Sequence, residues 1–338
     1  MHEHLLPFET IDRDIFVKRK AETDARFGCE PEKRPVDQIL NYGIVNLNKP
    51  KGPTSHQVSE YLQKILNISK AGHSGTLDPG VTGVLPVALG IATKIVLVLL
   101  TAGKEYVAIA HIHKEISDAK IKKAFEALTG KIKQLPPIKS AVKRQLRERT
   151  VYYADILEID GQDVLFKMGC EAGTYVRKWV HDLGKLLETG AHMSELIRTK
   201  AGPFNDKEMV TLQDLDDAYW YWKNEKNEKF IRHCIQPVEK GIAHLPRIWL
   251  LDSAVDSVCH GALLNAPGVS QFESGIAIGE LVALLSLKGE LVAIAKAKMF
   301  SEQILDADRG TVAKTERVFM LPGTYPKTSR NFESLEKK

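Results

Sequence analysis

The longest uninterrupted aliphatic run of this chain, from Ile95 to Leu100, contains only six residues. A helix that crosses a bilayer needs about 20 apolar residues, so the pattern predicts a folded soluble protein. His2, Glu3 and His4 stand at the start instead of the apolar stretch of a signal peptide, and we expect a cytoplasmic protein. A length of 338 residues exceeds what one hydrophobic core usually organises, which favours two domains.

Strand and helix patterns alternate over the first two thirds of the chain. Gly43 to Lys49 predicts a strand, Thr54 predicts the start of a helix, and Asp160-Gly161 predicts a hairpin turn. Thr174 is a candidate helix cap, and Thr211 with Asp214 forms a capping box. From about residue 247 to 325 short apolar runs separated by glycine predict a small β-rich domain. Together these patterns indicate an α+β protein.

The cysteines and the charged residues indicate which kinds of site and partner to expect. The four cysteines lie far apart and form no C-x-x-C pair, so neither a disulfide framework nor a thiolate zinc site is indicated. The net charge of +4 is too small to imply a polyanionic partner. The window from Lys131 to Arg149, however, contains seven basic residues and one acid, and such a segment is either a solvated loop or a contact to nucleic acid.

One glycine-rich segment, residues 71–83, surrounds a single carboxylate, Asp78, with four glycines and Pro79. Proline disfavours helical geometry at the residue before it, so Pro79 restricts the direction of Asp78. The tripeptide Asp78-Pro79-Gly80 by itself is typical of a turn. The segment contains neither G-x-G-x-x-G nor G-K-[ST], so it is no phosphate loop.

As a whole, this segment resembles the catalytic motif of the TruB-type pseudouridine synthases. Further motifs match in the family's order: residues 48–56 lie before this segment, and residues 104–106, 173–177 and 196–204 lie after it. Residues 136–139, 252–255, 259–262 and 323–326 are similar to the archaeal and eukaryotic branch, the dyskerin-like subunit of H/ACA ribonucleoproteins. The resemblance extends from about residue 30 to Tyr325.

The resemblance implies a fold and a domain order. We expect a catalytic domain over residues 41–240, with a mixed, largely antiparallel sheet and flanking helices. A PUA domain, a small β-rich barrel that binds RNA, is expected over residues 247–325. Residues 1–40 would form an extension that packs on the C-terminal domain, and residues 326–338 a flexible tail.

The resemblance also implies the chemistry. A uridine flipped out of folded RNA loses its N1 glycosidic bond, the uracil turns, and C5 is joined to C1′. The matching catalytic carboxylate is Asp78, which either attacks C1′ or takes a proton from C2′. Arg177 would pair with Asp78 and keep it ionised in a dry pocket, because a nearby cation lowers the pKa of a carboxylate. Tyr106 would stack on the base near C5. The isomerisation consumes nothing, and we expect no cofactor or metal.

The other predicted site residues bind the RNA. Leu196 would close the pocket wall, and His73 would fill the space left by the flipped base. Lys49 is suited either to a phosphate contact or to supporting the active loop. Within the basic window, we expect a loop that grips the substrate strand, with its cations at Lys139, Lys143, Arg144 and Arg147.

Two further features stand apart from these roles. His111, His113 and Glu115 would share a strand face, but no ligand set of metal-site spacing surrounds them. Archaeal relatives commonly have a basic residue after Asp-Pro, where this chain has Gly80. A phosphate contact beside the active site is therefore expected to be missing, with slower or more partner-dependent turnover.

Three functional hypotheses follow from the resemblance. The first is an RNA pseudouridine synthase that acts on rRNA or tRNA within an H/ACA ribonucleoprotein. Its partners would be a guide RNA, small proteins of the Gar and Nop types, and a kink-turn-binding protein of the ribosomal L7Ae type. The second is a stand-alone enzyme for the tRNA T loop, and the third is a non-catalytic RNA-binding scaffold.

Overall fold

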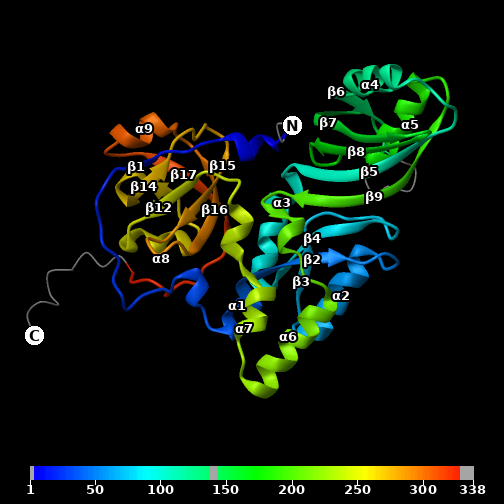
Figure 1. The fold of residues 1–338 in the computed structure, drawn as a ribbon. Helices are drawn as coiled ribbons and strands as arrows, with labels where there is room; N and C mark the ends of the chain where they lie inside the picture. Colours follow the sequence, from blue (N-terminus) through cyan, green and yellow to red (C-terminus); the bar gives the residue numbers. More distant parts are fainter. Residues whose placement is uncertain (1–3, 137–142, 328–338) are drawn as a thin grey trace, which may run out of the picture. The chain divides into compact units, whose positions relative to one another are not determined.

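The computed structural model describes residues 4–136 and 143–327, which form two compact units (Figure 1). The first unit spans residues 4–11 and 44–236, and the second spans residues 12–43 and 237–327. Each unit has its own β-sheet. No helix within the described ranges is long and apolar enough to cross a membrane.

The first unit is built on a large mixed sheet with the strand order β2-β4-β9-β5-β8-β7-β6, while β3 pairs with β4 and β10 with β9. The parallel pair is β4 with β9, and the other pairs along this order are antiparallel, as expected for the predicted α+β fold. The strands are β2 (Gly43–Lys49), β3 (Ala71–His73), β4 (Thr82–Leu89), β5 (Lys104–Ile112), β6 (Gly130–Gln134), β7 (Arg147–Asp160), β8 (Asp163–Cys170), β9 (Ala191–Ala201) and β10 (Phe204–Asn205).

Helices connect these strands and cover the sheet. They are α2 (Ser55–Leu66), α3 (Val96–Thr101), α4 (Asp118–Ala127), α5 (Val176–Leu186), α6 (Leu212–Glu225) and α7 (Lys229–Cys234). Thr54 caps α2 and Thr211 forms the predicted capping box with Asp214 at α6. The prediction for α5 was wrong, because Tyr175 is its cap residue and the Thr174 hydroxyl donates instead to Glu171 O.

Helices α4 and α5 lie against the sheet (Figure 1). An aromatic cluster is buried between them and the sheet. Phe125 of α4 and Trp179 of α5 have ring centroids 5.0 Å apart, and Phe166 of β8 lies within 5.4 Å of both. Such pairs contribute about 0.5–1.5 kcal/mol each beyond the area that they bury. The core therefore anchors the buried face of α5, the helix that carries Arg177.

The second unit is a β-rich body whose sheet has the order β1-β14-β12-β15-β16-β17-β13. Its strands are β1 (Ile15–Val17), β12 (Arg247–Leu250), β13 (Leu264–Asn265), β14 (Val269–Glu273), β15 (Leu281–Leu285), β16 (Leu291–Ala297) and β17 (Thr311–Val318), and its helices are α1 (Val36–Tyr42), α8 (Asp252–Cys259) and α9 (Ser301–Asp306). The short strand β11 (Gln236–Pro237) lies at the boundary of the two units.

The N-terminal segment is divided between the units. Strand β1 pairs antiparallel with β14, and Lys18 donates hydrogen bonds to three carbonyls at the end of α9. Residues 4–11, in contrast, belong to the first unit, where Leu6 is fully buried and Glu9 accepts a hydrogen bond from Lys200 at 2.9 Å. Residues 12–43 thus pack with the C-terminal part of the chain, and residues 4–11 do not.

Candidate active site

The loop between β3 and β4 carries Asp78 and is held from beneath by buried polar groups. Ser55, at the start of α2, accepts a hydrogen bond from Leu77 N at 2.8 Å and donates one to Leu77 O at 3.1 Å. The amide of Val81 donates to Asp78 O at 2.9 Å, which closes the turn that Asp-Pro-Gly predicts. The main chain on both sides of Asp78 is therefore fixed.

Lys49 is the second support of this loop. Its Nζ donates to three carbonyls, at 2.8 Å to Pro50, 3.2 Å to Pro79 and 2.9 Å to Val81, and the residue has no exposed surface. Burial lowers the pKa of the Lys49 ammonium, while the charge of Asp78 acts in the opposite direction. Of the two roles expected for Lys49, the structure shows support of the loop; the assignment of Lys49 to substrate binding is corrected, because its side chain is buried on three carbonyls.

Arg177 reaches Asp78 from the first turn of α5. Its Nη2 donates to Asp78 Oδ2 at 2.9 Å, and the two side chains are 67% and 60% exposed. The predicted pair is therefore present, but the expected dry pocket around it is not, because both side chains remain accessible to water in the free chain. The carboxylate is accordingly open to an incoming ribose.

Tyr106 lies behind this pair on β5 and is 9% exposed. Burial raises the pKa of its phenol, and the charge of Arg198, which faces it from β9, opposes that rise. The phenol therefore stays protonated at neutral pH, suited to stacking and hydrogen bonding rather than to acting as a phenolate base.

Arg198 is the residue that sequence reasoning missed. It is 1% exposed, and its guanidinium donates to Val84 O at 2.7 Å and to Gly75 O at 3.2 Å, so it joins both ends of the Asp78 loop. Burial lowers its pKa, which interaction with Tyr106 opposes. Gly83 permits this arrangement: it has a φ of +103°, and a Cβ there would lie 2.2 Å from Arg198 O. The run Arg198-Thr199-Lys200 carries no local signal of a buried cation, because burial of Arg198 depends on the pairing of β9 with β4 and β5.

A shared apolar cluster brings the neighbours of these residues together. Leu77 and Val81 flank Asp78, Val176 precedes Arg177, and all three belong to the same cluster as Tyr106. Leu196, half-buried, packs against this cluster, so the structure places the predicted pocket-wall residue beside the predicted catalytic ones. Packing of apolar neighbours therefore positions charged side chains that themselves face water.

His73 ends β3, next to the Asp78 loop. Its ring is partly buried, and its Nδ1 has no hydrogen-bond partner among the described residues. Burial lowers the pKa of the ring, and the charges of Arg198 and His56 act in the same direction. His73 is therefore neutral at physiological pH, which suits a side chain that moves into the place of a base.

The basic loop is described only in part. Lys139 lies outside the described residues, while Lys143 and Arg144 are exposed and Arg147 begins β7 with its side chain half-buried. Lys143 and Arg144, before β7, thus face water, and a contact of any of these cations to RNA stays a prediction.

His111 lies on β5, but β5 ends at Ile112, so His113 and Glu115 lie beyond the strand and the expected shared strand face is not formed. His113 Nε2 lies 2.9 Å from His192 Nδ1 of β9, and His111 Nδ1 lies 2.8 Å from Asp163 Oδ1. His113 is thus bonded to His192 and His111 to Asp163, and within residues 4–136 and 143–327 no group of three His, Cys, Asp or Glu residues is arranged to hold a metal ion. Glu115 is exposed and joins none of these contacts.

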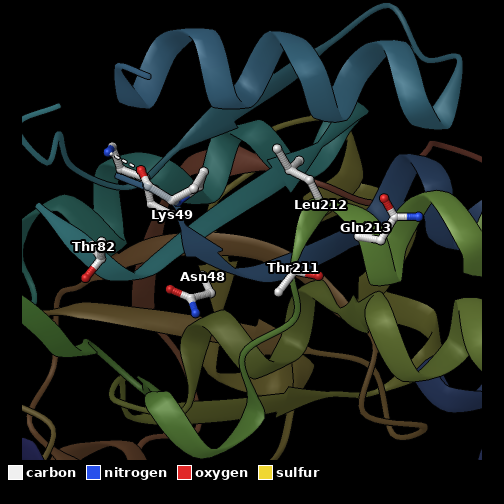
Figure 2. A pocket seen from close by; sticks show the side chains of 7 residues that line it. Asn48, Lys49, Thr82, Thr211, Leu212 and Gln213 are labelled. Carbon is white, nitrogen blue, oxygen red and sulfur yellow. Dashed lines mark hydrogen bonds between the residues drawn. The ribbon is translucent and has the colours of Figure 1, made fainter. Parts of the chain in front are cut away.

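A cavity of about 400 Å³ has Lys49 among its lining residues (Figure 2). Its walls come from the end of β2, the start of β4 and the N-terminus of α6, through Asn48, Lys49, Pro50, Thr82, Thr211, Leu212 and Gln213. Asp78, Tyr106 and Arg177 do not line it. It is therefore distinct from the place where the target base would meet Asp78.

Models of known families match most parts of this chain. A model described as TruB family pseudouridylate synthase (N-terminal domain) matches residues 63–120, and one for the tRNA pseudouridylate synthase B C-terminal domain matches residues 177–243. A PUA domain model matches residues 246–319 and a DKCLD domain model matches residues 6–59. A model of the Pus10 C-terminal region matches residues 96–207.

Individual proteins match over almost the whole chain. The probable tRNA pseudouridine synthase B of Methanopyrus kandleri is 53% identical over 322 residues, which are 95% of each protein. That of Pyrococcus furiosus is 50% identical over 325 residues, 96% of this chain and 95% of the relative.

Solved structures agree with these matches. A chain of a Cbf5-Nop10-Gar1 complex has a TM-score of 0.91 at 50% identity, covering 96% of this chain and 98% of that one. A chain of an H/ACA RNP bound to a substrate RNA containing 2′-deoxyuridine has a TM-score of 0.91 at 48% identity, covering 96% and 100%. By motif, fold and site, the chain belongs to the TruB family of pseudouridine synthases and carries a PUA domain.

Proposed function

We propose that this chain isomerises uridine to pseudouridine in RNA as the catalytic subunit of an H/ACA guide ribonucleoprotein. The observation that carries the proposal is the 2.9 Å ion pair between Asp78 and Arg177, on a fixed loop beside Tyr106. The guanidinium fixes the direction of the Asp78 carboxylate, which either proposed role of Asp78 uses.

The reaction balances without a co-reactant. The N1–C1′ bond of the uridine breaks, the detached uracil turns, a C5–C1′ bond forms, and the proton of C5 is lost while N1 gains one. Asp78 either forms a transient bond to C1′ or removes a proton from C2′ and returns it. Tyr106 stacks on the uracil while it is detached, Leu196 limits the space in which it turns, and His73 fills the space that the flipped base leaves in the RNA. Flipping the nucleotide costs a few kcal/mol, which contacts to the RNA backbone offset.

The partners are proposed from the similar structures. Both the Cbf5-Nop10-Gar1 complex and the H/ACA RNP with substrate RNA contain a chain that this protein matches over 96% of its length. We propose that its partners are small proteins of the Nop10 and Gar1 types, a guide RNA and an L7Ae-type protein. The PUA domain would hold the guide, and Lys139, Lys143, Arg144 and Arg147 would contact the substrate strand. We place this assembly in the cytoplasm.

A second candidate is favoured by the relatives' names. The proteins from Methanopyrus kandleri and Pyrococcus furiosus are both described as probable tRNA pseudouridine synthases B. Modification of tRNA without a guide would need the same Asp78 and Arg177 and differs only in how the RNA is chosen.

One assay separates these candidates. Tritium release from RNA labelled at uridine C5 would be measured on guide-matched RNA and on tRNA, with and without guide RNA and the small proteins. Release that depends on the guide supports the H/ACA assignment, and release from tRNA alone supports the stand-alone enzyme. Release by an Asp78→Asn variant at the parent rate would refute Asp78 as the catalyst.

A further inference from the structure

Gln134 makes an unusual two-point contact with the main chain of one distant residue. It is the last residue of β6 and is 2% exposed. Its Oε1 accepts a hydrogen bond from Tyr175 N at 2.9 Å, and its Nε2 donates to Tyr175 O at 3.2 Å. Two bonds from one planar amide fix both the place and the orientation of that stretch of main chain.

Tyr175 is the cap residue of α5, and no side-chain cap hydrogen bond is made at this position. Its carbonyl also accepts the first hydrogen bond of the helix, from Trp179 N at 3.0 Å. The first amides of a helix lack partners within it, so an outside group commonly satisfies them. Here Gln134, from another strand, accepts from the amide of the cap residue itself, as the N3 side chain of a capping box does.

This contact fixes the main chain just before Arg177. Arg177 lies two residues after Tyr175, in the first turn of α5, so a shift of Tyr175 moves the base of its side chain. The ion pair with Asp78 cannot supply the restraint, because its partners are 67% and 60% exposed and exposed pairs are weak and screened by salt. The apolar contacts of α5 bury Val176 in the first turn as well as Trp179 and Val180, so Gln134 adds a polar restraint to a turn that packing also holds.

We propose that Gln134 is a positioning residue, which holds the start of α5 so that Arg177 stays within ion-pair distance of Asp78 while the reaction proceeds. The inference deepens the proposed function and rests on it. Misplacement of a catalytic group by about 1 Å can cost roughly a hundredfold in rate. Loss of Gln134 therefore lowers the rate of the chemical step, and RNA affinity stays within about twofold.

The test compares Gln134→Ala, Gln134→Glu and a matched control. Single-turnover tritium release should fall about 10- to 100-fold in Gln134→Ala. Gln134→Glu keeps the acceptor for Tyr175 N, and we expect it to recover part of the rate. The control is Asn46→Ala, which removes a buried amide that donates to Asn205 O at 2.8 Å in the same unit. It should lose stability and keep the parent rate.

A double-mutant cycle tests whether Gln134 acts through Arg177. If Gln134 acts through Arg177, the two residues are coupled and their effects on the rate are not additive. The loss of rate caused by Gln134→Ala should therefore be smaller in an Arg177→Lys background than in the parent. Equal effects in both backgrounds, or the same rate loss in Asn46→Ala, would overturn the inference.

Hydrogen exchange provides a readout that needs no substrate. Gln134→Ala should make the Trp179 amide exchange about tenfold faster, while the amide of Leu183, later in the helix, is unchanged. Unchanged exchange at Trp179 would refute the positioning role, whatever the activity. If the parent chain releases no tritium from any RNA, the proposed function fails, and the exchange result still decides whether Gln134 holds α5.

Discussion

Arg177 donates a hydrogen bond to Asp78 across 99 positions of sequence, from the first turn of a helix to a loop between two strands. Both side chains are more than half exposed, so the pair is a feature of the surface and not of the core. The geometry of the pair depends on buried residues that hold the loop and the helix in place. Lys49, Ser55 and Arg198 hold the loop, and the apolar face of α5 holds the helix.

The first prediction concerns Asp78 itself. Asp78→Asn preserves size and removes the charge, so tritium release should fall by roughly a thousandfold or more. Because the side chain is exposed, the free energy of unfolding should change by no more than about 0.5 kcal/mol. Urea unfolding checks the second statement, and a large loss of stability would show that the carboxylate is structural.

Arg177→Lys keeps the positive charge and loses the planar fork. We expect a marked loss of single-turnover rate, while stability falls by less than about 1 kcal/mol, since exposed ion pairs contribute little. The rate of the variant should also decline more steeply with salt than that of the parent. A salt response identical to that of the parent would argue against a role of the ion pair in the reaction.

Lys49→Met removes the donor to three carbonyls of the active loop. Buried acceptors left without a partner cost about 1–3 kcal/mol, and we expect that loss in urea unfolding together with a fall in the rate of tritium release. RNA affinity should change little, because Lys49 is buried. Lys51→Met is the matched control, since Lys51 is exposed and two positions away. Weakened RNA binding with an unchanged rate of tritium release in Lys49→Met would instead support a contact of Lys49 to a substrate phosphate.

Lys104 predicts a pH dependence of stability. Its Nζ donates to the carbonyls of Leu99, Leu100 and Ala102 at the end of α3, and burial lowers its pKa from 10.5 to about 7. Between pH 7 and 10.5 the unfolded chain therefore binds more protons at this residue than the folded chain, so the cost of burying the charge is full below pH 7 and disappears as the pH rises.

The check is urea unfolding of the parent and Lys104→Met between pH 7.5 and 9.5. The parent should gain up to about 1 kcal/mol per pH unit relative to the variant. Lys51→Met should follow the parent. Parallel slopes for the parent and Lys104→Met would contradict the lowered pKa.

Gly80→Lys tests whether the missing basic residue after Asp78-Pro79 costs a phosphate contact. A Cβ at Gly80 would meet nothing within 4 Å, and Gly80 is not among the residues with a positive φ, so the fold should tolerate a side chain there. One added phosphate contact should strengthen RNA binding and increase the slope of log affinity against log salt by about 0.7–0.9. Gly80→Gln is the neutral control, and equal salt slopes in the two variants would exclude the contact.

Local signals in the sequence were sufficient for the α+β class and for the catalytic loop. Thr54 and the Thr211–Asp214 box cap helices where the pattern predicted them, because a cap depends on atoms three residues away. The hairpin at Asp160-Gly161 and the turn at Asp78-Pro79 are equally local. The resemblance to the family then supplied Arg177 as the partner of Asp78.

What the tertiary structure decided are the contacts between residues distant in sequence. Lys49 is an inward support instead of a phosphate contact, Arg198 is a buried cation behind the active loop, and Gln134 clasps the start of α5. A lysine, arginine or glutamine has the same letter on a wet surface and in a core. Its role depends on which carbonyls surround it after the strands have paired, and strand pairing joins segments that no local pattern relates.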